Sequence, residues 1–222
     1  IREKYKAERV INAEEHVVLP GFISAHVHVA DIMLRGVSAN RGLYDWLDNI
    51  KYPGTHVMTP EANEIAAALY CVEAIQAGIT TFVENAAASG KGFSEDSIKA
   101  KMRVYDHAGM RNVFAQAILD KPTSSELREI REIDRAKERG VKHVPFANEA
   151  EPTEQVMARV EALIKKYHGT AEGRQSVWPS PYLAWAITPE AMWRSLELAE
   201  KYDIMSTTHV SEMRFEEQGP HS

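Results

Sequence analysis

Short apolar runs alternate with longer amphipathic stretches along most of the chain. The apolar runs are rich in β-branched residues and predict strands over residues 19–29, 79–85, 112–119, 176–187 and 204–210. Several of the stretches between them place apolar residues every three or four positions, and two begin at the capping sequences Thr59-Pro60-Glu61 and Thr188-Pro189-Glu190. Because strands that alternate with helical crossovers favour a parallel sheet, the pattern predicts an α/β fold.

Two α/β architectures fit this alternation: an open doubly wound sheet, or the first strands of a (β/α)8 TIM barrel. No Gly-x-Gly-x-x-Gly sequence follows a predicted strand, which weakens the dinucleotide-binding form of the doubly wound sheet. A complete barrel takes about 250 residues and eight strands. The 222 residues of this chain contain five predicted strands, so we expect part of a barrel.

Some segments carry more specific expectations. Residues 31–54 show little periodicity and many aromatic and charged residues, which predicts a long first loop over the barrel mouth. Residues 124–139 are densely charged, which predicts a solvated helix. Pro179 and Pro181 are expected to mark the end of regular pairing in the fourth strand. The helix predicted after Thr59 carries an apolar stripe made of Ile65, Leu69, Val72 and Ile75.

Composition and charge exclude several kinds of partner. Apolar residues make up 44% of the chain, which is enough for a core, and a formal net charge of −6 argues against nucleic acid as a partner. No apolar stretch approaches the roughly 20 residues of a membrane span, so no membrane partner is expected. Cys71 is the only cysteine and cannot form an internal disulfide, which predicts a reducing, cytoplasmic location.

Two histidines at the end of the first predicted strand are candidate metal ligands. Because alternate residues of a strand face the same side, His26 and His28 point together. His209 lies near the end of the fifth predicted strand, and in a barrel the C-terminal strand ends form one active face. Three imidazoles there can hold a divalent ion and leave a position for water. The alternative is a solvated strand end with two ordinary histidines.

Several segments resemble the amidohydrolase superfamily. The sequence VVLPGFISAHVH, residues 17–28, is similar to the strand-one signature of these metal-dependent hydrolases. A narrower branch contains atrazine chlorohydrolase, melamine deaminase and the thioadenosine and S-adenosylhomocysteine deaminases. The segments that resemble this branch include LYDWL at 43–47, AGITT at 77–81, SVWP at 176–179 and THVSE at 208–212. The resemblance implies a partial TIM barrel over residues 19–222 and a remnant of a small β-domain over residues 1–18.

The resemblance also implies roles for individual residues. His26, His28 and His209 would bind one divalent ion, zinc first and iron as the alternative, and later strands would supply a further histidine and an aspartate. Glu212, the candidate catalytic residue beside His209, would move a proton to the ring nitrogen under attack. The fourth strand has neither a lysine nor a glutamate at residues 177–181, which implies a single ion. The candidate substrate contacts are Trp46, Trp178, Asp45 and Asn85.

The implied activity is hydrolytic displacement of an amino group from a heteroaromatic ring of the purine, pterin or triazine kind. An s-triazine chlorohydrolase, which releases chloride, is the alternative enzyme. A catalytically incomplete polypeptide that keeps three ligands is the alternative outside the enzymes. The expected partner is a small heteroaromatic substrate, and the full-length protein is expected to be a homo-oligomer.

Overall fold

A four-stranded parallel β-sheet with helices against it positions the candidate site. The computed structural model describes residues 4, 6–38, 40–86, 94–121, 138–140, 150–184 and 186–212. The strands are β1 (Phe22–Val27), β2 (Ile79–Ala86), β3 (Arg111–Ile118) and β4 (Gln175–Pro181). The longer helices are α3 (Pro60–Gln76), α4 (Glu95–His107), α6 (Thr153–Tyr167) and α8 (Pro189–Lys201). The short helical segments are η1 (Val29–Leu34), α1 (Leu43–Trp46), η2 (Leu47–Lys51), α2 (Tyr52–His56) and α7 (Thr170–Gly173).

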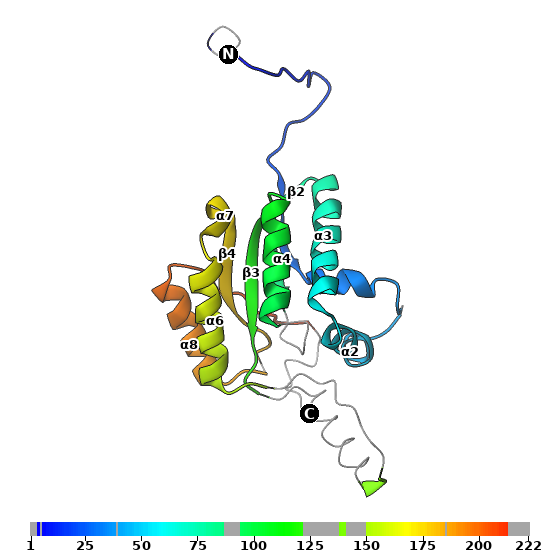
Figure 1. Cartoon of the computed structure of the whole chain (residues 1–222), viewed down its shortest axis with the longest axis vertical. Helices are drawn as coiled ribbons and strands as arrows, with labels where there is room; N and C mark the ends of the chain where they lie inside the picture. Colours follow the sequence, from blue (N-terminus) through cyan, green and yellow to red (C-terminus); the bar gives the residue numbers. More distant parts are fainter. Residues whose placement is uncertain are drawn as a thin grey trace.

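The order of the strands separates the two predicted architectures. The strands lie in the order β1-β2-β3-β4 and every neighbouring pair is parallel. A doubly wound sheet reverses its strand order at a switch point, whereas the strands of a barrel follow one another in sequence. Figure 1 shows α4 and α6 in front of the strands, as the outer helices of a barrel would be. The fold is therefore α/β and corresponds to part of a TIM barrel.

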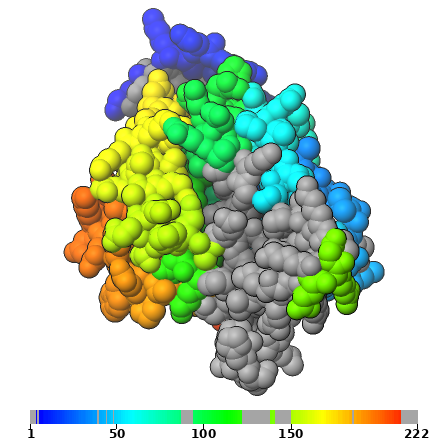
Figure 2. Space-filling model, turned by 60° about the horizontal axis from the view of Figure 1, so that its bottom comes forward, coloured from blue at the N-terminus to red at the C-terminus, as the bar shows by residue number. Residues whose placement is uncertain are grey.

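The hydrophobic core lies between the sheet and these helices. Its largest fully buried apolar side chains include Phe82, Met102, Tyr105, Phe114 and Ile164. Figure 2 shows α6 and α8 side by side on the surface, where Arg194 donates to Glu154 at 2.6 Å and Lys201 donates to Glu161 at 2.8 Å. No helix within the described ranges is both long and apolar enough to cross a bilayer.

The segment predicted as a long first loop, residues 31–54, lies between β1 and α3 and contains several short helical segments. Each segment within η1, α1, η2 and α2 has only four to six residues. Such lengths are too short for hydrophobic periodicity to reveal. The segments pack closely, because a Cβ added to Gly54 would lie 2.6 Å from a Leu34 methyl carbon.

The apolar stripe predicted on α3 faces outward among the described residues. Its four members are 40–53% exposed. The buried face of α3 instead carries small side chains, including Ala66, Ala67, Cys71 and Ala74. Small residues allow the helix to approach the sheet and α4 closely. The pattern therefore predicted the helix correctly and did not identify its buried face.

The fifth predicted strand is not a regular strand. Within residues 204–210, His209 forms an isolated parallel bridge to Leu183. The backbone N–H of Thr207 also donates to the carbonyl of Pro179 at 3.4 Å. The segment therefore runs beside the end of β4 without a continuous ladder, and it still brings His209 to the C-terminal ends of the strands.

Both prolines of β4 are paired with β3, and Pro181 is the last residue of the strand. Pro179 is in register with Gln116 and Pro181 with Ile118, so the expectation that regular pairing ends at these prolines is confirmed for Pro181 and wrong for Pro179. A proline has no N–H to donate and is tolerated where one side of a strand is open. In the described residues, β4 is the last strand of the sheet and has only isolated contacts on its other side.

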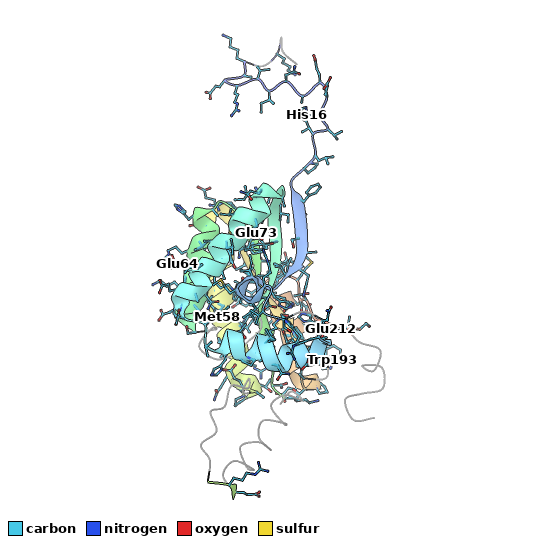
Figure 3. All side chains as sticks on the ribbon, turned by 90° about the vertical axis from the view of Figure 1, so that its right-hand side faces the viewer. His16, Met58, Glu64, Glu73, Trp193 and Glu212 are labelled. Carbon is cyan, nitrogen blue, oxygen red and sulfur yellow. The ribbon has the colours of Figure 1, made fainter. Side chains whose placement is uncertain are left out.

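The N-terminal segment extends away from the sheet. Residues 6–21 form no helix or strand, and Figures 1 and 3 show this segment, with His16, projecting beyond the helices. The side chains of Val17 and Val18 are both 82% exposed. The domain boundary expected after residue 18 stays a prediction. The helix expected over 124–139 lies outside the described residues except for positions 138 and 139.

Asp120 joins the N-termini of two helices just beyond the end of β3. Its carboxylate accepts hydrogen bonds from the Thr188 backbone N–H at 2.7 Å, from the Thr188 hydroxyl, and from the Thr153 hydroxyl at 2.7 Å. Negative charge at a helix N-terminus is stabilising, and hydrogen bonds to a charged group are stronger than neutral ones.

Replacing Asp120 by alanine is expected to lower the free energy of unfolding by about 2–3 kcal/mol, because it removes these charged hydrogen bonds. Urea denaturation followed by circular dichroism measures the change. The control is Asp106→Ala, which removes an exposed ion pair to Arg174 and should cost less than about 1 kcal/mol. Equal losses in the two variants would contradict the role of Asp120.

Candidate metal centre

The register of β1 is irregular just before the two histidines. Between Ser24 and Val27, β1 advances three residues where β2 advances two, and an opposite shift directly after Phe22 cancels it. Val27 packs against the core, and alternation turns its neighbours His26 and His28 to the opposite face. The prediction that these two histidines point together is confirmed.

The three predicted histidines converge on one point. The Nε2 atom of His28 lies 3.3 Å from the Nε2 atom of His26 and 3.3 Å from that of His209. One ligand atom from each ring lies within 4.8 Å of the others. His209 is nearly buried, His28 is half-buried and His26 is exposed. The site is therefore shielded on the side of His209 and open on the side of His26.

Backbone carbonyls fix the orientation of two of these rings. Nδ1 of His28 donates to the carbonyl of Asn85 at 2.7 Å, and Nδ1 of His209 donates to the carbonyl of Tyr182 at 2.8 Å. A carbonyl can only accept, so the proton of each neutral ring sits on Nδ1 and the lone pair sits on Nε2. Two lone pairs therefore face each other at 3.3 Å, an arrangement that a shared cation stabilises.

The two distances from the His28 nitrogen to the other ligand nitrogens match the edge of a tetrahedral metal site. Zinc binds histidine nitrogens at about 2.0–2.1 Å, and the edge of a tetrahedron with that radius is about 3.3–3.4 Å. The distances from His28 to His26 and to His209 are both 3.3 Å. The three side chains present are therefore suited to hold a zinc-sized divalent ion.

The surroundings of His26 and His28 favour their neutral forms. Burial, together with the charge of Lys51, lowers the pKa of His28 to about 2. Burial also lowers the pKa of His26, followed by the charges of His209 and Lys51. A histidine must be neutral to bind a metal through its lone pair, so these shifts favour ligation.

A buried ion pair lies beside His28. Nζ of Lys51 is 3.0 Å from a carboxylate oxygen of Asp31 and 5.4 Å from the centre of the Trp46 ring. A cavity of about 10 Å³ is lined by His28, Asp31, Lys51 and Asn85, among others. Sequence reasoning did not identify this pair. The sequence signal that could have revealed the pair is Asp31, three residues after His28, in the segment interpreted as a loop.

Glu212 follows His209 after a sharp change of direction. Ser211 has a φ of 58°, in the left-handed region that residues other than glycine rarely adopt. The exposed carboxylate of Glu212 acts electrostatically on His26 and on Tyr182, whose ring packs edge-on against His209 at 4.8 Å. Figure 3 places Glu212 in the half of the molecule opposite the extended segment with His16. The predicted neighbour of His209 therefore lies within electrostatic range of the histidines.

The other predicted contact residues differ in their surroundings. Asn85 is 1% exposed, donates to the Ser180 hydroxyl at 3.4 Å, and has a buried side-chain oxygen without a partner in the described residues. Trp178 is half-buried on β4 and faces away from the core that holds Val177. Asp45 is exposed and accepts from Arg41 at 2.8 Å. Asn85 thus lies beside the histidines, whereas Asp45 takes part in a surface ion pair.

Comparison with known proteins gives relatives along nearly the whole chain. A 5-methylthioadenosine/S-adenosylhomocysteine deaminase from Syntrophomonas wolfei is 29% identical over 209 residues, which are 94% of this chain and 40% of that protein. An 8-oxoguanine deaminase from Pseudomonas aeruginosa is 30% identical over 209 residues, which are 93% of this chain and 42% of that protein. The chain spans about two fifths of the length of these curated relatives.

Solved structures share the fold at lower identity. Atrazine chlorohydrolase from Arthrobacter aurescens TC1, complexed with zinc, has a TM-score of 0.67 and 21% identity, with 87% of this chain and 41% of that chain covered. Guanine deaminase from E. coli has a TM-score of 0.64 and 20% identity, with 89% of this chain and 39% of that chain covered. The sequence profile of the amidohydrolase family matches residues 17–218. Because that match includes nearly every residue, the chain belongs to the amidohydrolase family.

Proposed function

We propose that the protein is a metal-dependent aminohydrolase that replaces an amino group on a heteroaromatic ring with oxygen from water. The observation that carries the proposal is the convergence of the His26, His28 and His209 Nε2 atoms at the strand ends. The names of the two curated relatives support it, because both are deaminases of purine derivatives. We therefore propose a purine-like ring as the substrate.

The proposed cofactor is a single zinc ion, with iron as the alternative. When bound, such an ion lowers the pKa of a coordinated water to about 7 and so supplies a nucleophile at neutral pH. The three histidines would hold the ion through Nε2, and the carbonyls of Asn85 and Tyr182 would keep two of the rings in the required tautomer. Two related solved structures, an atrazine chlorohydrolase and an adenosine deaminase, contain zinc, which supports this choice.

Glu212 is the proposed proton carrier. Its carboxylate would take one proton from the attacking water and deliver it to the ring nitrogen. The second water proton would pass from the added hydroxyl to the amino group, so that the C–N bond breaks, ammonia leaves and the ring keeps a carbonyl oxygen. Its exposure and its electrostatic effect on His26 support this role, because a carrier must reach both solvent and the reacting atoms. No other acid among the candidate residues lies closer in sequence to His209.

The remaining candidates would shape the substrate pocket. Trp178, on the same face of the sheet as the histidines, is proposed as a flat wall for the ring, and Trp46 as a second wall. Asn85 has a buried side-chain oxygen able to accept a hydrogen bond from a ring N–H or amino group. Asp45 is retained as a weaker contact because its carboxylate is engaged by Arg41.

Dechlorination of a triazine is the second candidate activity. The likeness to atrazine chlorohydrolase favours it at the level of fold. It shares the nucleophile with deamination and differs in the group that leaves, which is chloride instead of ammonia. The third possibility is that the described chain binds an ion without turnover, because the curated relatives are much longer.

Metal analysis and product analysis together test the proposal. The purified protein is expected to bind about one equivalent of zinc and to release ammonia from at least one amino-substituted purine in a panel that includes adenosine, 8-oxoguanine and S-adenosylhomocysteine. Chloride release from atrazine without ammonia release from the panel would favour the second activity. Tight zinc binding without any product would favour the third possibility, and absence of zinc binding would contradict the metal centre itself.

Two further expectations accompany this proposal. A cytoplasmic location and a homo-oligomeric full-length protein remain predictions. Burial raises the pKa of the Cys71 thiol to about 11, so the thiol is protonated at neutral pH and unreactive, which is compatible with a reducing compartment. Sedimentation of the full-length protein measures its oligomeric state.

A further inference from the structure

The ion pair between Lys51 and Asp31 takes no part in holding the proposed metal ion, yet it lies next to the ligands. The Lys51 side chain is 4% exposed and that of Asp31 is 19% exposed. Lys51 is the last residue of η2. Asp31 lies in η1, the segment that begins directly after His28. Charges this deeply buried are costly to desolvate, so a pair that is kept beside a reaction site calls for an explanation.

Two contacts hold the ammonium, and a third fixes its carboxylate partner. The carboxylate of Asp31 lies 3.0 Å from Nζ of Lys51, and the Trp46 ring lies 5.4 Å from it. The backbone N–H of Asp31 also donates to the carbonyl of His28 at 3.1 Å, which fixes Asp31 relative to a metal ligand. The ammonium therefore cannot move into solvent as the end of a surface lysine does.

The fixed charge lies within reach of the metal ligands. Lys51 and Asp31 line the same small cavity as His28 and Asn85. After burial, the charge of Lys51 is the largest influence that lowers the pKa of His28, and it also acts on His26. Because the Lys51 side chain is buried, its charge has a larger effect on its neighbours than it would have at the surface.

We infer that Lys51 tunes the metal centre as a fixed positive charge, which weakens the binding of the divalent ion and stabilises the negative charge that the ring acquires during displacement. The inference rests on the proposed function. A cation repels a second cation, so Lys51 opposes metal binding. When oxygen adds to the ring carbon, an electron pair moves onto the ring nitrogen before Glu212 delivers its proton there, and a preorganised positive charge favours that transient state over the uncharged substrate. Lys51 therefore acts through its charge on the metal ion and on the ring, and it does not bind the ion.

If Lys51 only held its segment in place, its loss would have different effects from the loss of a charge that acts on the metal ion. Loss of a purely structural lysine would loosen the site, so zinc binding and turnover would both weaken. Loss of a repelling charge strengthens zinc binding while turnover falls. The sign of the change in zinc affinity therefore distinguishes the two roles.

The test measures the zinc dissociation constant by competition with a chromophoric chelator, together with kcat and KM for ammonia release, in variants of the purified protein. In Lys51→Met, zinc is expected to bind about tenfold more tightly, and kcat is expected to fall about tenfold with little change in KM. In Asp31→Asn, the charge of Lys51 is no longer compensated, and zinc is expected to bind about tenfold more weakly. The control Lys165→Met removes an equal charge from an exposed position and should leave both quantities unchanged.

Zinc binding by Lys51→Met that is unchanged or weaker would overturn the inference. If Lys51→Met does not fold, the double variant D31N/K51M replaces it, because the neutral pair leaves no buried charge unpaired. Relative to Asp31→Asn alone, the double variant is expected to bind zinc about tenfold more tightly, and equal affinity would also overturn the inference. If the unchanged protein binds no zinc, the proposed metal centre fails as well, whereas normal zinc binding with the wrong response at Lys51 rejects only this inference.

Discussion

Replacing Glu212 by glutamine is expected to lower kcat for ammonia release by about 10²–10⁴-fold while the zinc content stays the same. Glutamine keeps the size of the side chain but cannot take up and release a proton. Glu212 is exposed and acts electrostatically on His26, so its loss should affect proton transfer more than folding. Steady-state kinetics measure kcat, and metal analysis of the same preparation measures bound zinc.

A matched glutamate on α8 controls for the change of charge. Glu200 is also exposed, and Glu200→Gln should leave kcat unchanged. A Glu212→Gln variant with the kcat of the unchanged protein would assign the proton transfer to another group. A variant that has lost its zinc would instead indicate that Glu212 supports the metal centre.

Replacing His28 by alanine is expected to weaken zinc binding by on the order of a hundredfold or more, because structural zinc sites gain about 10–16 kcal/mol from about four ligands. His28 is the central ligand, since its Nε2 lies 3.3 Å from those of both His26 and His209. Its loss removes one ligand and the ring whose Nε2 lies 3.3 Å from both of the other ligand atoms. Competition with a chelator measures the affinity, and ammonia release should fall in parallel.

The control for this loss is a histidine outside the site. His107 is exposed at the end of α4, and His107→Ala should bind zinc as tightly as the unchanged protein. If His28→Ala keeps the same zinc affinity, the ion is held elsewhere. If zinc affinity falls equally in both variants, the effect is on folding and not on ligation.

Sequence patterns predicted helices and strands well where the interactions that form them join residues close in the chain. Ser94, Thr59 and Thr188 cap α4, α3 and α8, because a side-chain oxygen accepts a backbone N–H three residues ahead in each case. The β-branched run from Ile79 predicted β2, which extends to Ala86. These interactions join residues close in sequence, so the pattern contains them.

Burial and pairing were less predictable because they depend on distant segments. The stripe of Ile65 and its neighbours on α3 has the spacing of a buried face, yet small residues such as Ala66 occupy the inner side. The run from Ile204 has the composition of a strand, yet His209 forms only an isolated bridge to Leu183. Periodicity indicates that a face exists, whereas the neighbouring element decides which face is covered.

The sequence by itself determined the kinds of ligand and their local spacing. The pair His26 and His28 at a strand end, and Glu212 three residues after His209, can be read directly from the chain. Their chemistry follows from the residue types alone.

Only the tertiary structure decided that these groups meet. His28 and His209 are 181 residues apart, and the order of the parallel strands brings them together. The groups that fix their tautomers are the carbonyls of Asn85 and Tyr182, and every residue has a carbonyl, so no sequence pattern marks them. The register shifts in β1 and the pairing of Lys51 with Asp31 likewise depend on how separate segments pack, because neither follows from the spacing of nearby residues.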